Sequence, residues 1–125
     1  MTLKAGSTFL LGSSGDGALH LHIVVFDADA SGNTLIVNLT TQRDHPDTTV
    51  VFNAEDHPFI NHPSIVYYAE AQITKLDHLE KTIKLGLAKM RNPLDAKRLV
   101  LVRKGFALSV YAPKYIQKYC AERMK

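Results

Sequence analysis

Two histidines stand one residue apart in the segment 19–22, Leu-His-Leu-His, and their spacing could support chemistry. Because imidazole titrates near neutral pH, His20 and His22 could act as a general acid and a general base. The same two rings could supply two of the ligands of a zinc ion, or they could serve a structural or surface role. The sequence has no phosphate-binding glycine loop, nucleophile elbow or paired-cysteine motif, which disfavours nucleotide phosphoryl transfer and serine-hydrolase chemistry.

A zinc site would need further ligands from the loops of the chain. The residues that could be recruited show no diagnostic spacing: Asp27, Asp29, His45, Asp47 and His57. We therefore expect no metal or cofactor, and a histidine-based metal-dependent enzyme remains an alternative.

Polar side chains alternate along a second segment that ends near residue 42. Asn38, Thr40 and Gln42 would share one face of a strand there, and Arg43 follows them. Amide, hydroxyl and guanidinium groups of this kind can contact phosphate or sugar, although a solvated sheet face has the same composition.

The elements that would carry these residues are mainly strands. Alternating apolar residues and turn signals predict strands at 7–11, 19–26, 34–41, 48–53 and 64–70. Short strands joined by loops favour a small twisted barrel or sandwich over a parallel sheet.

Helical spacing begins at Leu76 and continues in the C-terminal third. Asn92-Pro93 interrupts it, and a second helix is expected over 94–104 with Gly105 as its C-cap, with a strand pair over 98–111 as the alternative. A last helix is expected with Pro113 at its first position. The prediction is therefore one domain over residues 1–125, mainly β or α+β, with a barrel body at 5–75 and a mostly helical part at 76–125.

Charge is distributed unevenly along the 125 residues. Residues 1–83 hold four Lys or Arg and ten Asp or Glu, a net charge of −6, whereas residues 84–125 hold eleven and two, a net charge of +9. The basic end predicts an anionic partner, either nucleic acid or an acidic protein, or else it is a solvated helical surface.

Cysteine content and hydropathy indicate the compartment. Cys120 is the only cysteine, so no internal disulfide can form, as is usual for proteins of a reducing compartment. Phe9, Leu10 and Leu11 are too short a run for a signal peptide, and no stretch approaches the roughly 20 apolar residues that span a bilayer. We expect a cytoplasmic protein without membrane contact.

Three segments taken in order, Ala5–Leu11, His22–Phe26 and Leu35–Gln42, resemble the opening of the PemK/MazF-type toxin ribonucleases. That family begins with a glycine-aspartate strand, continues with an Arg-Pro-small-Val-Val strand, and then has a strand ending in a hydrophobic-Thr-Ser/Ala-Gln step. The stretch Ser64–Leu79 also looks like the family's Ser-Val strand running into its turn and helix. The likeness covers roughly residues 5–85.

The resemblance implies a small SH3-like barrel with helices, a homodimer, and metal-independent cleavage of single-stranded RNA. Thr40 would match the catalytic threonine, and Ser64 would begin the Ser-Val strand beside the RNA. The family's Arg-Pro falls on Leu21-His22, so its catalytic arginine is absent here.

The hypothesis from sequence is therefore a toxin-like endoribonuclease, active or degenerate, with His20, His22 and Thr40 as catalytic residues. RNA would be bound by Asn38, Gln42, Arg43 and Ser64, and an acidic antitoxin is a further expected partner. The alternative from another class is a non-catalytic nucleic-acid- or protein-binding module on the same barrel, with affinity that falls as salt rises.

Overall fold

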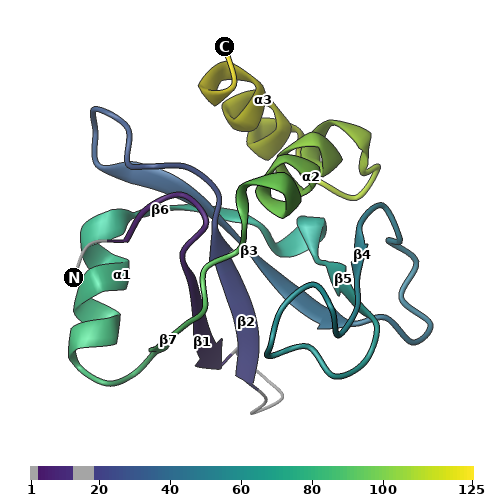
Figure 1. The fold of residues 1–125 in the computed structure, drawn as a ribbon. Coiled ribbons are helices and arrows are strands. Elements are labelled where there is room, and N and C mark those ends of the chain that lie inside the picture. The colour runs from purple at the N-terminus through teal and green to yellow at the C-terminus, as the bar shows by residue number, and fades with distance from the viewer. Residues whose placement is uncertain (1–2, 13–18) are drawn as a thin grey trace.

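The computed structural model describes residues 3–12 and 19–125. Within these residues it forms one antiparallel sheet with three α-helices and a short 3-10 helix, so the α+β prediction is confirmed (Figure 1). The strands are β1 (Thr8–Gly12), β2 (Leu19–Val24), β3 (Asn33–Thr41), β4 (Val51–Phe52), β5 (Ser64–Val66), β6 (Gln72–Lys75) and β7 (Lys89–Arg91). The helices are α1 (Leu76–Lys84), α2 (Ala96–Leu108) and α3 (Lys114–Arg123), with the 3-10 helix η1 at Tyr68–Glu70.

The nine-residue strand β3 organises the sheet. One of its edges pairs with β2, while its other edge pairs first with β6 and then, near Thr41, with β5. In the described part of the chain the strand order is β4-β5-β3-β2-β1-β7, with β6 beside β3, so β4 and β7 are edges that do not pair with each other. The sheet is therefore open, and a closed barrel is wrong.

A single strand over 64–70 is also wrong, because the chain leaves the sheet between β5 and β6. The 3-10 turn η1 interrupts the pairing with β3 and turns Tyr68 into the protein interior. There the Tyr68 hydroxyl donates to the carbonyl oxygen of Val102 on α2, at 2.8 Å, and its ring packs edge-on against Phe106. Packing against α2 thus outweighs the strand propensity of this segment.

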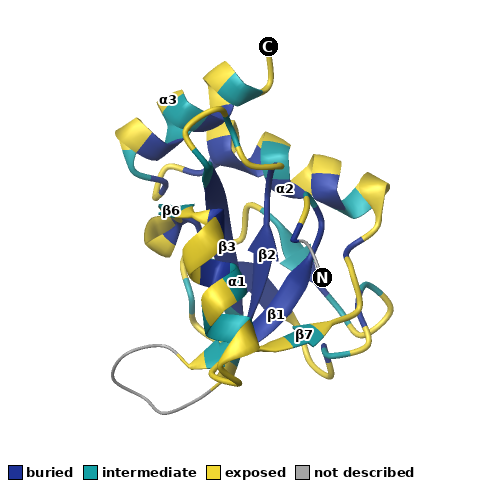
Figure 2. Cartoon of the chain, turned by 90° about the vertical axis from the view of Figure 1, so that its left-hand side faces the viewer, coloured by how far each residue is buried: buried dark blue, intermediate teal, exposed yellow. Residues whose placement is uncertain are grey.

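Apolar side chains cover both faces of the central strands, which appear buried in Figure 2. Leu35, Val37 and Leu39 join the larger core with α2 and α3, whereas Ile36 joins a smaller one with α1. This alternation along β3 follows the period of two expected for a strand and confirms the predicted faces. Helices on both sides of β3 hold it in place, and its Thr41 end carries the candidate site described below.

The helices α1 and α2 confirm the helical spacing seen from Leu76 onward. A strand pair over 98–111 is wrong, because α2 runs continuously to Leu108. Gly105 lies inside that helix against the Tyr68 ring, so its predicted role as a C-cap is also wrong. Pro113 precedes α3 as its N-cap instead of occupying its first turn.

The strand β7 was not predicted, because Lys89–Arg91 has no alternating pattern of its own. Its register, Thr8 opposite Arg91 and Leu10 opposite Lys89, adds the strand to the free edge of β1. The C-terminal part of the chain therefore contributes to the sheet as well as to the helical layer.

Candidate functional site

A pocket of about 270 Å³ opens where β2 begins, β3 ends and β5 begins. It unites three of the residues proposed from the sequence, His20, Thr40 and Ser64. The remaining lining residues come from the same strands and from the loop that precedes β5: Leu19, Leu21, Leu39, Thr41, Phe59, Ile60, Asn61 and His62. Two imidazoles and three hydroxyl groups therefore line a partly apolar pocket.

The ring of His20 is held by the backbone of the neighbouring strand. Its Nδ1 lies 3.2 Å from the carbonyl oxygen of Leu39. Because a carbonyl oxygen can only accept, Nδ1 carries the hydrogen, and in the neutral ring the lone pair is on Nε2. A histidine oriented in this way by a backbone carbonyl is suited to act as a base.

The second imidazole of the pocket is that of His62, which was not among the candidates predicted from the sequence. Its Nε2 lies 2.9 Å from the hydroxyl oxygen of Thr41. The contact arises because β5 pairs with the end of β3, with Thr41 opposite Ser64, so that the residues just before β5 lie beside Thr41. The only signal in the sequence was the His62-Pro63 pair, which indicates an extended chain but not its neighbour.

The loop that carries His62 is anchored by the buried ring of His57. Its Nε2 lies 2.6 Å from the carbonyl oxygen of Asn92, and its Nδ1 accepts from the amide of Phe59. These two contacts suit the tautomer that carries its hydrogen on Nε2 and its lone pair on Nδ1. His57, considered from sequence as a metal ligand, instead ties the loop to the connection between β7 and α2.

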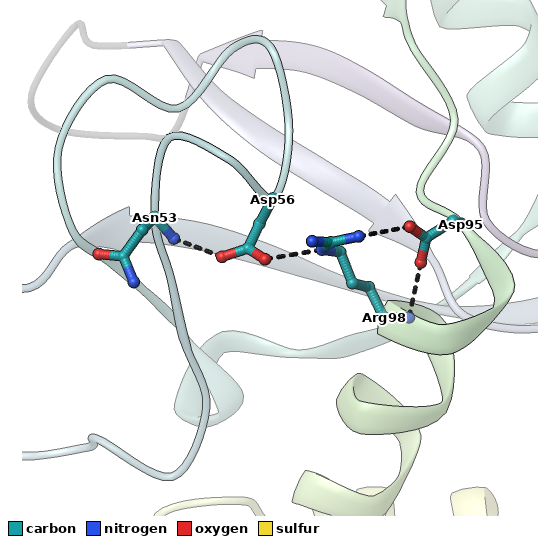
Figure 3. A network of polar contacts seen from close by, with 4 residues as sticks. All are labelled: Asn53, Asp56, Asp95 and Arg98. Atoms are coloured by element: carbon teal, nitrogen blue, oxygen red, sulfur yellow. Dashed lines mark hydrogen bonds and ion pairs between the residues drawn. The ribbon is translucent and has the colours of Figure 1, made fainter.

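A polar network ties the start of the same loop to α2 (Figure 3). Asp56 accepts from the backbone N–H of Asn53 at 2.7 Å and pairs with Nε of Arg98 at 2.7 Å. Arg98 also pairs with Asp95, the N-cap of α2, whose side chain accepts from the Arg98 amide. That last hydrogen bond lowers the pKa of Asp95. The loop is thus fixed at Asp56 and His57, a few residues before it reaches the pocket.

The residues Gln42 and Arg43 line a second hollow, of about 530 Å³, that adjoins the pocket. The two hollows share Thr41 and His62. Arg43 has a φ of 34°, a conformation that costs a non-glycine residue roughly 1–2 kcal/mol, and strain of this kind is often found at functional sites. The turn around it is closed by a hydrogen bond from the His45 amide to the Gln42 carbonyl. Exposed Arg43 therefore lines the same hollow as His62.

The remaining two sequence candidates, His22 and Asn38, lie elsewhere. They are opposite each other in the pairing of β2 with β3, and both are buried. The His22 ring stacks on Phe9, with 5.2 Å between centroids, and its Nδ1 donates to the His20 carbonyl. Neither residue lines the pocket, so the surroundings of His22 differ from those of His20.

Burial lowers the pKa of His22, because desolvation disfavours the charged ring. The unfolded chain therefore binds this proton more readily than the folded protein, and the free energy of unfolding should fall as the pH drops below about 6.5, the pKa of an unperturbed histidine. We expect urea denaturation to show a smaller loss of stability between pH 7 and pH 5 for His22→Gln than for the wild type. The exposed His78→Gln variant is the matched control and should keep the wild-type slope; equal slopes in both variants would contradict the prediction.

The other residues considered as metal ligands from sequence are engaged separately. Within residues 3–12 and 19–125, no three His, Cys, Asp or Glu side chains form a group that could hold a metal ion. Asp29 accepts from Tyr119 at 2.9 Å, and buried Asp47 accepts from Ser109 at 2.8 Å. Both carboxylates thus fasten loops to the helical layer.

Cys120 offers no nucleophile. It is a buried residue of α3 in the larger core, and burial raises its pKa to about 11. At neutral pH the group is therefore a thiol, and the thiolate is the reactive form.

Comparison with known proteins does not place this chain in a family. No protein-family model matches the sequence, and no curated protein matches it either. Among the described residues, none of the helices is long and apolar enough to cross a membrane.

Proposed function

We propose that the protein is a metal-independent endoribonuclease that cleaves single-stranded RNA in the pocket formed by β2, β3 and β5. The observation that supports this most directly is that His20 and His62 line the same pocket together with the hydroxyls of Thr40, Thr41 and Ser64. Cleavage of RNA by its own 2′-hydroxyl needs a base, an acid and stabilisation of the phosphate, and these residues can provide all three.

His20 is the proposed base. Its ring is oriented by the contact of Nδ1 with the Leu39 carbonyl oxygen and lines the pocket, so the neutral imidazole would take the proton of the ribose 2′-hydroxyl. The freed oxygen then attacks the adjacent phosphorus, a bond forms to the 2′-oxygen, and the bond to the 5′-oxygen of the next nucleotide breaks. The products would be a 2′,3′-cyclic phosphate and a 5′-hydroxyl end.

His62 is the proposed acid. Its protonated ring can donate to the departing 5′-oxygen, and its contact with Thr41 fixes the ring at the rim of the pocket. Arg43, in the adjoining hollow, can pair with the phosphate oxygens as charge builds up on them. Thr40 and Ser64 would hold the reacting phosphate by hydrogen bonds, and Gln42 would contact the neighbouring nucleotide.

The resemblance to PemK/MazF-type toxins supports the same activity. We propose that the open antiparallel sheet is a distant form of their SH3-like barrel, in which β3 pairs with different strands along its length. The proposal extends to a cytoplasmic homodimer held inactive by an acidic antitoxin. Here His20 and His62 would do the work that the family assigns to its missing arginine.

The proposed function is tested by incubating the purified protein with a mixed-sequence single-stranded RNA in EDTA. We expect discrete fragments with 2′,3′-cyclic phosphate ends, detected on denaturing gels and by mass spectrometry. Thr40→Ala should slow cleavage by roughly tenfold to a hundredfold, because one hydrogen bond to a charged group contributes about 1.5–3 kcal/mol. Exposed Thr48→Ala is the matched control and should cleave like the wild type.

Intact RNA after prolonged incubation would exclude this function. If RNA were then retained at low salt and released at high salt, the protein would be a binding module, as its charge distribution allows. The exposed lysines of the C-terminal helices, at 97, 104, 114 and 118, favour that second candidate.

A further inference from the structure

A hollow of about 370 Å³ lies at the far end of β2 from the pocket, where the chain leaves the sheet and meets α2 and α3. Its lining combines two arginines with one carboxylate, one ring and two aliphatic side chains: Phe26, Asp27, Val100, Arg103, Arg123 and Met124. We propose that this hollow binds a phosphodiester of a single-stranded RNA, as a second contact remote from the cleavage pocket. The inference rests on the proposed function for its choice of RNA.

The two guanidinium groups are fixed in place by neutral partners. Arg103 donates from Nε and Nη2 to the carbonyl oxygen of Val25, at 3.0 and 2.7 Å. Arg123 donates from Nη2 to the Asp27 carbonyl at 2.6 Å and from Nη1 to the Tyr119 hydroxyl. Both cations also lie against the Phe26 ring, 4.5 and 4.8 Å from its centroid.

These contacts orient the arginines without neutralising them. In the described part of the chain, the Lys and Arg ion pairs are those of Arg98 with Asp56 and Asp95. Arg103 and Arg123 therefore keep their full charge, and the hydrogen bonds just described leave the Arg103 Nη1 and Arg123 Nε hydrogens for a ligand. A guanidinium already held in one orientation loses little entropy when it pairs with a phosphate.

The charge of the hollow matches one phosphodiester. Among the lining residues, two arginines and the carboxylate of Asp27 leave one net positive charge, and each internal phosphate of RNA carries one negative charge. Asp29 does not line the hollow, but its carboxylate accepts from Tyr119 and also attracts Arg123. Asp27 is exposed, and its Oδ1 accepts from the Ala5 amide. Its carboxylate can also accept from a ribose 2′-hydroxyl, the group that distinguishes RNA from DNA.

The distance between the pocket and the hollow could be spanned by one continuous RNA strand. Phe26 follows His20 by six residues, most of them in β2, so the two residues are separated by at most roughly 20 Å at 3.3 Å per residue. An RNA of several nucleotides could therefore occupy the pocket and the hollow together, whereas a dinucleotide could occupy only one of them.

The test adds a carboxylate to the hollow without removing either arginine. Met124 is 49% exposed at its rim, so Met124→Glu should fold normally and repel a phosphate. Leu108→Glu, at a residue 71% exposed on α2 that does not line the hollow, adds the same charge to the same basic region. Affinity for a fluorescein-labelled ten-nucleotide RNA is measured by polarisation from 50 to 200 mM salt, in EDTA and in a His62→Ala background that keeps the RNA intact.

We expect Met124→Glu to weaken binding at least fivefold more than Leu108→Glu and to reduce the slope of log affinity against log salt by about 0.7, the value for one lost phosphate contact on a single strand. We also expect RNA to bind more tightly than DNA of the same sequence. Equal effects of the two substitutions, on affinity and on slope, would overturn the second contact. Because binding is measured without cleavage, an inactive protein would contradict the proposed function and leave this comparison intact.

Discussion

Replacing Gly105 with alanine is expected to destabilise the protein by about 3 kcal/mol or more, although alanine is ordinarily the better helix former. A Cβ atom at this point of α2 would stand 1.8 Å from the Tyr68 hydroxyl oxygen and 2.5 Å from the ring carbon that bears it. The ring cannot easily withdraw, because it is fully buried, packs against Phe106 and donates to Val102. Overpacking of this kind usually costs 1–3 kcal/mol, and here a fixed hydrogen bond opposes relaxation. Chemical denaturation monitored by circular dichroism measures the change.

A double-mutant cycle identifies the cause. Tyr68→Leu removes the ring tip and should itself be destabilising, because it leaves a cavity and removes the hydrogen bond to the Val102 carbonyl. In that background Gly105→Ala should cost little or should stabilise, since the roughly 1 kcal/mol gained in helix propensity is no longer cancelled by the clash. Additive effects of the two substitutions would rule out the steric explanation. Leu108→Ala, at an exposed residue of the same helix, is the control for a side-chain change without contacts.

The contact between Tyr68 and Gly105 also explains why the secondary structure around these two residues could not be predicted from the sequence. Glycine after a helical run is often a C-cap, and a β-rich run such as Ser64–Glu70 is often one strand. Both expectations are local, and both fail because Tyr68 and Gly105 meet across the core. The alternation of side chains along β2 and β3 was predictable, by contrast, because successive residues of a strand point to opposite faces of the sheet.

Only some of the residues of the candidate site could likewise be predicted from the sequence. His20 and Thr40 could be selected from sequence because they lie near the ends of strands with clear patterns. His62 could not, because its position beside Thr41 depends on the register of β5 against β3. His22 was selected with His20 for its spacing alone, and burial against Phe9 removed it from the pocket.

The anchored loop before β5 positions one of the two histidines of the pocket, His62. His57 fixes the loop to the segment between β7 and α2, and the pairing of Asp56 with Arg98 fixes it to α2 itself. The next residues of the loop, 59–62, are the lining residues that no strand pairing holds. The imidazole of His62 is therefore positioned by contacts between its loop and the C-terminal part of the chain. The acidic N-terminal part and the basic C-terminal part of the sequence thus both contribute to the geometry of the pocket.

The largest effects on activity are expected from the two pocket histidines. His20→Ala and His62→Ala should each lower the rate of RNA cleavage between about a hundredfold and ten-thousandfold, the usual contribution of a positioned acid or base. The double variant should lose little more than either single variant, because a base and an acid that act in one step form a unit. Initial rates on a fluorogenic single-stranded RNA measure these changes, and buried His22→Gln and exposed His78→Gln serve as comparison variants.

The pH dependence of the rate separates the two roles. The wild type should give a bell-shaped profile, because cleavage needs one imidazole neutral and the other protonated. In His20→Ala the residual rate should no longer fall on the acidic side, since the base that acid would protonate is absent. In His62→Ala the residual rate should no longer fall on the alkaline side, since the acid that alkali would deprotonate is absent. If both variants kept a bell-shaped profile, the chemistry would lie outside this pocket. If His20→Ala lost the alkaline fall and His62→Ala lost the acidic fall, the roles of His20 and His62 would be reversed.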